Sequence, residues 1–67
     1  MQEVKVGNIC RDGSFGTIGV VTTLDARKVV GICVSTQNGG IVGNTWESFS
    51  PVLLAENLDQ WQRMGRV

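Results

Sequence analysis

The chain has 67 residues, 42% of them hydrophobic, and its six basic and six acidic side chains give a net charge of zero. This length allows a single domain covering residues 1–67, and the apolar fraction excludes a disordered chain. A domain of this size buries only about 60% of the surface of its unfolded chain, so it needs a well-packed core or a partner chain. Zero net charge disfavours nucleic-acid binding, which needs a basic surface, and it favours self-association.

The N-terminal residues MQEVKVGN lack the basic and apolar regions of a signal peptide, and no apolar run is long enough to span a membrane. We therefore expect a cytoplasmic protein with no membrane contact, in which Cys10 and Cys33 are reduced thiols. Two cysteines and no histidine cannot supply a four-ligand zinc site within one chain. No metal or other cofactor is expected.

The first two-thirds of the chain has the composition of β-strands. The strand-like segments are residues 3–6, 17–24, 29–36 and 41–49. The first alternates valine with charged residues, and the next two are rich in β-branched side chains. The sequence NGG at 38–40 predicts a tight turn between the last two, whereas DG at 12–13 marks a turn or loop.

The last third changes character. Ser50 followed by Pro51 is typical of a helix start, and Gly65 is a plausible helix end. Four large apolar residues fall at helical spacing on one face of this segment. They are Leu54, Leu58, Trp61 and Met64. The competing interpretation is a short 3₁₀ turn at 51–54 followed by a fifth strand.

Glycines recur in or beside the strand-like segments, which indicates a sheet curled sharply on itself and favours a small closed barrel. With GTIGVV at 16–21, and with NGG followed by WESFSPVLL, the chain resembles the SH3-like small β-barrels, including KOW and Tudor-type modules, over roughly residues 4–55. The resemblance implies a mostly β fold of about five strands. The barrel core would cover about residues 3–55, and the segment 51–65 would form a C-terminal helix or an extra strand.

The plasmid-encoded type II dihydrofolate reductases have the same architecture and a similar length. Their last strand carries Val-Gln-Ile-Tyr before Pro-Val, and this chain has ESFS before Pro51 and Val52. The glutamine and tyrosine that such an enzyme uses are therefore missing. A divergent oligomeric pore-type reductase remains the third functional alternative.

The sequence offers few residues suited to catalysis, so we expect a protein that is not an enzyme. No histidine provides the usual general base near neutral pH, and the acidic residues are scattered. Cys10 lies beside Arg11, which could lower the pKa of the thiol, but a structural role is favoured for both cysteines. The glycine-rich residues 13–19 lack the lysine and the helix of a phosphate-binding loop.

The aromatic residues are the main candidates for a binding site. Trp46 and Phe49 differ in parity, so on a regular strand they point to opposite faces. Phe49, near Pro51 and the leucines, is the better candidate for the core, and Trp46 is then equally suited to an exposed site or to the core. Phe15 lies between glycines at a loop tip, where it would anchor a partner or cap the barrel. The candidate partner-binding residues are Phe15, Asn44, Trp46 and Glu47.

The sequence favours a non-enzymatic binding module whose partner is a protein. Self-association would use the face of Leu54, Leu58, Trp61 and Met64, with Trp61 as its central anchor. The alternative is KOW-type binding of RNA or single-stranded nucleic acid through Arg11, Arg27 and Lys28. For this alternative we expect no binding tighter than about 10 μM at physiological salt.

Overall fold

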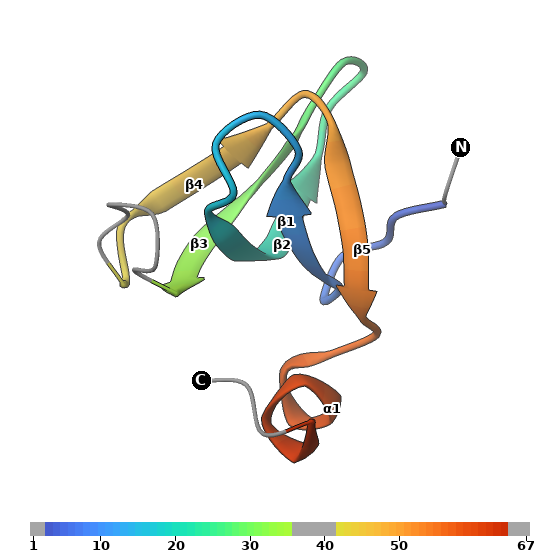
Figure 1. The fold of residues 1–67 in the computed structure, drawn as a ribbon. Coiled ribbons are helices and arrows are strands. Elements are labelled where there is room, and N and C mark those ends of the chain that lie inside the picture. The colour runs from blue at the N-terminus through green and yellow to red at the C-terminus, as the bar shows by residue number, and fades with distance from the viewer. Residues whose placement is uncertain (1–2, 36–41, 65–67) are drawn as a thin grey trace.

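The computed structural model describes residues 3–35 and 42–64. Its elements are β1 (Ile9–Asp12), β2 (Ile18–Leu24), β3 (Val29–Ser35), β4 (Thr45–Ser48), β5 (Pro51–Ala55) and α1 (Leu58–Arg63) (Figure 1). The strands form one antiparallel sheet in the order β4-β3-β2-β1-β5. The prediction of a mostly β fold of about five strands with a C-terminal helix is confirmed.

The sheet is not closed into a barrel, which corrects that part of the prediction. Its two edge strands, β4 and β5, are joined by Phe49 and Ser50 but do not pair with each other in the described sheet. The ladder is instead interrupted by bulges, between Ile9 and Cys10 in β1 and between Val21 and Thr23 in β2. Because a bulge increases the local twist of a strand, these irregularities bend the sheet and bring β1 and β2 near β4.

The predicted strand at residues 3–6 is wrong, and the first strand lies at Ile9–Asp12 instead. The Asn8 side-chain oxygen accepts a hydrogen bond from the Lys5 backbone N–H at 2.8 Å, and the Asn8 N–H donates to the Lys5 carbonyl at 3.1 Å. Such local side-chain bonds compete with strand pairing. Gly7, with φ of 95°, completes a turn that an alternating pattern cannot reveal.

The predictions for residues 17–24 and 29–36 match β2 and β3, which pair with each other. The fourth strand is shorter than the predicted 41–49 and begins at Thr45. It pairs with β3 as the predicted hairpin requires, with Trp46 opposite Gly31. The NGG turn at 38–40 lies outside the described residues.

The C-terminal segment follows neither competing prediction in full, because the fifth strand begins at Pro51, where the sequence predicts a helix or a 3₁₀ turn. Residues 51–55 form β5, paired with β1, so Ser50 and Pro51 do not begin a helix. The helix begins after Asn57, whose side chain accepts a hydrogen bond from the Gln60 N–H at 2.7 Å. Arg63 and Asp59 form an ion pair at 2.9 Å across one helical turn. The predicted helix end at Gly65 lies outside the described residues.

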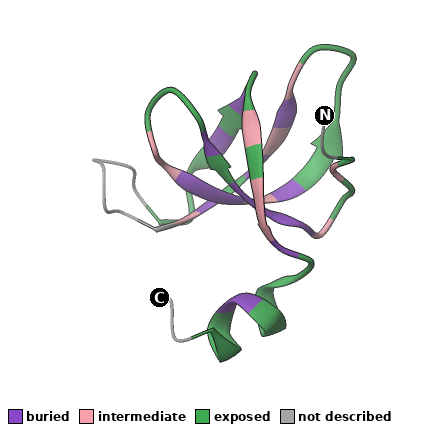
Figure 2. Ribbon diagram, turned by 45° about the vertical axis from the view of Figure 1, so that its right-hand side comes forward, coloured by how far each residue is buried: buried purple, intermediate pink, exposed green. Residues whose placement is uncertain are grey.

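The core has two layers, one on each face of the bent sheet. Neighbouring residues of a strand point to opposite faces, so Ile9 and Cys10 enter different layers. The inner layer contains Cys10, Val21, Val29, Cys33 and Trp46. The outer layer contains Ile9, Ile18, Ala55 and Trp61. Figure 2 shows the buried part of α1 on the side that faces the sheet, where the helix covers the outer layer.

The two cysteines lie in one row across the sheet and form no disulfide. Gly19 of β2 is the register partner of both Cys10 on β1 and Cys33 on β3. Two strand spacings separate their Cα atoms by roughly 10 Å, beyond the roughly 4.4–6.8 Å that a disulfide bridges. The ring of Trp46 lies over Gly19 between them, because a Cβ there would overlap its indole.

We predict two titratable thiols per chain in the denatured, unreduced protein and much slower modification in the native protein. Burial raises the pKa of the Cys10 thiol, contrary to the lowering considered from its neighbour Arg11. A thiol with a raised pKa contains less of the reactive thiolate at neutral pH. Titration with an aromatic disulfide reagent, with and without denaturant, measures both quantities. A count of zero in denaturant would contradict the prediction.

Candidate functional site

Trp46 belongs to the core and is only 4% exposed. Its indole N–H donates to the Thr17 hydroxyl at 3.1 Å and to the Thr17 carbonyl at 3.3 Å, so its one polar atom is satisfied inside the protein. Phe49 is 68% exposed, so the prediction that Phe49 fills the core is wrong. The exposed aromatic side chain beside β4 is therefore Phe49.

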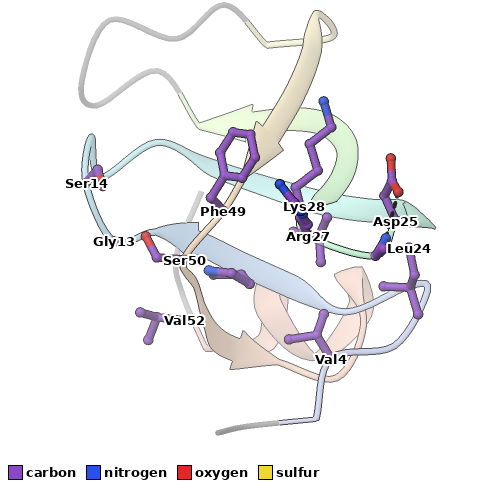
Figure 3. Close-up of a pocket in the computed structure, with 13 residues that line it drawn as sticks. Val4, Gly13, Ser14, Leu24, Asp25, Arg27, Lys28, Phe49, Ser50 and Val52 are labelled. Atoms are coloured by element: carbon purple, nitrogen blue, oxygen red, sulfur yellow. Dashed lines mark hydrogen bonds between the residues drawn. The ribbon is translucent and has the colours of Figure 1, made fainter.

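Phe49 stands beside a groove of about 740 Å³. The groove is formed by Val4, by the segments 13–14, 24–29 and 49–52, and by no other described residue. Figure 3 shows Phe49 and Lys28 next to each other on one wall, with Val4 on the opposite side. Leu24 and Val52 also line this groove and are exposed. We call this feature the Phe49 groove.

The charged groups of the groove lie on the turn between β2 and β3. The Lys28 ammonium is 2.9 Å from a Glu47 carboxylate oxygen and 5.7 Å from the centre of the Phe49 ring. The hydrogen bond and the charge of Glu47 raise the pKa of Lys28 above its usual range, which shows that the ion pair favours the charged ammonium. Arg27 is exposed and makes no ion pair with any described residue.

A buried carboxylate fixes the loops at one end of the groove. Asp12 accepts hydrogen bonds from the Ser48 hydroxyl at 2.7 Å and from the Phe15 N–H at 3.2 Å. The Gly13 N–H also donates to the Ser50 carbonyl at 2.9 Å. These bonds connect the loop after β1 to the link between β4 and β5, so the groove is preformed. In the sequence Asp12 is one of several scattered acidic residues, and only the DG turn indicates a structural role for it.

The predicted partner-binding residues do not form one site. Phe15 is 77% exposed at its loop tip but does not line the groove, and Asn44 is exposed outside it. Glu47 reaches the groove only through its ion pair with Lys28. Of the predicted nucleic-acid residues, Arg27 and Lys28 line the groove, whereas Arg11 lies on β1 opposite Val52 and is not among the lining residues.

The predicted oligomer face is also divided. Trp61 is only 4% exposed and packs in its own chain with Ile9, Ile18 and Ala55. Leu54 lies on β5 rather than on the helix and is half-buried. Leu58 and Met64 are exposed on or beside α1. Any contact between chains through this face would use these exposed residues, because Trp61 is already covered.

Nothing in the described part of the chain assembles a metal-binding cluster. Residues 3–35 and 42–64 contain no group of three or more Cys, Asp or Glu side chains placed to hold a metal ion. The helix α1 lacks the length and apolar character that crossing a membrane requires. The chain matches no family model, no curated protein and no solved structure. The Phe49 groove is therefore the candidate binding site of this protein.

Proposed function

We propose that the protein is a non-enzymatic binding module whose Phe49 groove docks an extended segment of a partner protein. The observation that carries this proposal is a preformed groove whose lining includes three exposed apolar residues, Leu24, Phe49 and Val52. Apolar side chains gathered in this way on a small protein are typical of interaction sites. An exposed aromatic at the wall of a groove is also the usual kind of binding anchor.

We infer further that the fold is an opened relative of the SH3-like small barrels. The support is the strand order, in which β1 to β4 form a meander and β5 returns to pair with β1. The short link at Phe49 and Ser50 places β4 and β5 on opposite edges of the strongly bent sheet. The groove lies where this link meets the loops after β1 and β2.

A protein partner is favoured over nucleic acid by the charges at the groove. Of the two basic residues that line it, Lys28 is already paired with Glu47. Nucleic-acid binding depends on several uncompensated cations along a backbone, and this groove presents one.

We predict that Phe49→Ala weakens the binding of groove ligands by at least about tenfold, because loss of a central aromatic anchor typically costs more than 1–2 kcal/mol. The ligands would be 12-residue peptides selected from a random phage-displayed library on the intact protein. Fluorescence polarisation would measure their affinities, and amide chemical shifts would locate them. Phe15→Ala is the matched control, since Phe15 is also an exposed phenylalanine but lies outside the groove.

Both variants should keep the thermal stability of the wild type, because neither ring is buried. The proposal fails if the library yields no binder whose chemical-shift changes lie at residues 24–29 and 49–52. It also fails if Phe15→Ala and Phe49→Ala lower the affinity for the selected peptides equally.

A further inference from the structure

The lining of the groove has a net positive charge, because Arg27 and Lys28 outnumber Asp25. Its ionisable lining residues are Asp25, Arg27 and Lys28. The Asp25 carboxylate accepts a hydrogen bond from the Ala26 N–H at 2.6 Å, and its negative charge also helps to raise the pKa of Lys28. The Asp25 N–H also donates to the Lys28 carbonyl at 2.9 Å, which closes the turn and holds both cations at the groove. Arg27 is left without an ion-pair partner among the described residues.

The positive charge of Lys28 is balanced by an acidic residue outside the groove. Glu47 comes from the edge strand β4, does not line the groove, and places its carboxylate 2.9 Å from the Lys28 ammonium. The Glu47 side chain is half exposed, so water competes for this ion pair. Ion pairs that water can reach contribute little to stability. The Lys28 ammonium also lies over the Phe49 ring, which places it beside the proposed apolar anchor.

From this arrangement we propose that the protein segment bound in the Phe49 groove carries an acidic residue next to its apolar anchor, that Arg27 and Lys28 bind its carboxylate, and that Glu47 competes for Lys28 in the unbound protein. The inference rests on the proposed function, since it concerns the ligand of the same groove. A carboxylate next to an apolar residue matches the groove in both charge and hydrophobicity. Arg27 can bind such a carboxylate through two parallel hydrogen bonds.

The competition by Glu47 has an unusual consequence for mutagenesis. Removing an acidic side chain outside the groove should strengthen binding, because Lys28 becomes available to the ligand. Glu47→Gln is therefore expected to increase the affinity for acidic peptides about threefold and to leave neutral peptides unchanged. Arg27→Gln is expected to lower the affinity for acidic peptides about fivefold, which is the effect of losing one charge-assisted hydrogen bond at a partly exposed site.

The test uses an array of 12-residue peptides with Leu, Ile, Val or Phe at alternating positions and Glu, Gln or Lys at one central position. Affinities for the intact protein and its variants are measured at low and at physiological salt. Asp59→Asn is the matched control for Glu47→Gln, because Asp59 also forms an exposed ion pair, with Arg63 on α1, outside the groove. Both variants change the net charge by the same amount.

The inference is supported if Glu peptides bind more tightly than their Gln and Lys counterparts. Their affinity should also increase in Glu47→Gln, stay unchanged in Asp59→Asn and decrease in Phe49→Ala. Equal affinities of Glu and Gln peptides, or no gain from Glu47→Gln, would overturn this inference. In that case binding that still depends on Phe49 would leave the proposed function intact, whereas the absence of any such binding would overturn both. A 12-nucleotide oligouridylate that binds more tightly than the Glu peptides and gains from Glu47→Gln would assign the two cations to phosphate instead.

Discussion

Replacing Gly31 with alanine is expected to unfold the protein. Gly31 is buried in β3, and a Cβ at this position would overlap the backbone carbonyl of Val20 on the neighbouring strand. The overlapping atom belongs to a central strand and not to a flexible side chain, so relief requires separating β2 from β3. Overpacking a core with side chains costs about 1–3 kcal/mol, and a backbone overlap exceeds that range. A domain of 67 residues has only about 3–10 kcal/mol of net stability.

Far-ultraviolet circular dichroism with urea titration would measure this effect. Gly7→Ala is the matched control: Gly7 has open space around its Cα but a φ of 95°, so alanine there costs only about 1–2 kcal/mol of backbone strain. We expect the Gly7 variant to fold with a lower midpoint and the Gly31 variant to show no folding transition. A Gly31 variant at least as stable as the Gly7 variant would contradict the register between β2 and β3.

The sequence predicts best the strands whose own residues strongly favour β-structure. The segments 17–24 and 29–36 are β-branched almost throughout, and they form the central pair β2 and β3. Residues 3–6 alternate equally well but form no strand, because Asn8 offers the Lys5 backbone a local hydrogen bond. Alternation reports which residues share a face, and it does not show whether a neighbouring strand is available to pair.

The exchange of roles between Trp46 and Phe49 has a similar origin. Their parity correctly indicates opposite faces of the chain, but parity alone does not say which face is covered. The deciding feature is Gly19 on β2, which leaves space for the indole between two cysteines. Gly19 is one of several glycines in or beside the strands, and the sequence does not show that this one accommodates a large side chain.

The groove could not be predicted because it depends on long-range contacts. Its walls come from Val4, from the turn at 25–28 and from the link at 49–52, which are far apart in the sequence. Asp12 holds that link through Ser48, and the pairing of β5 with β1 prevents Ser50 and Pro51 from starting a helix. The sequence places Arg27 and Lys28 next to each other, but the ion pair between Lys28 and Glu47 requires the fold.

Replacing Trp61 with alanine is expected to lower the melting temperature by at least about 12 °C, equally at low and high protein concentration. Trp61 packs with Ile9, Ile18 and Ala55 of its own chain. Truncating a buried tryptophan typically costs about 3–5 kcal/mol. In a domain of this size each kcal/mol shifts the melting temperature by roughly 4–8 °C. Thermal melts over a hundredfold concentration range, with light scattering at each concentration, measure both effects.

Leu58→Ala and Met64→Ala separate packing within the chain from the proposed self-association. Both side chains are exposed near Trp61, so truncating them should change the stability of a monomer by no more than about 0.5 kcal/mol. If chains associate through this face, the wild-type melting temperature rises with concentration and these two substitutions remove the rise. A Trp61→Ala variant that stays folded and merely dissociates an oligomer would contradict the packing of α1 on the sheet. A wild type that remains monomeric, with a constant melting temperature, would exclude the interface and leave Trp61 as an anchor of its own fold alone.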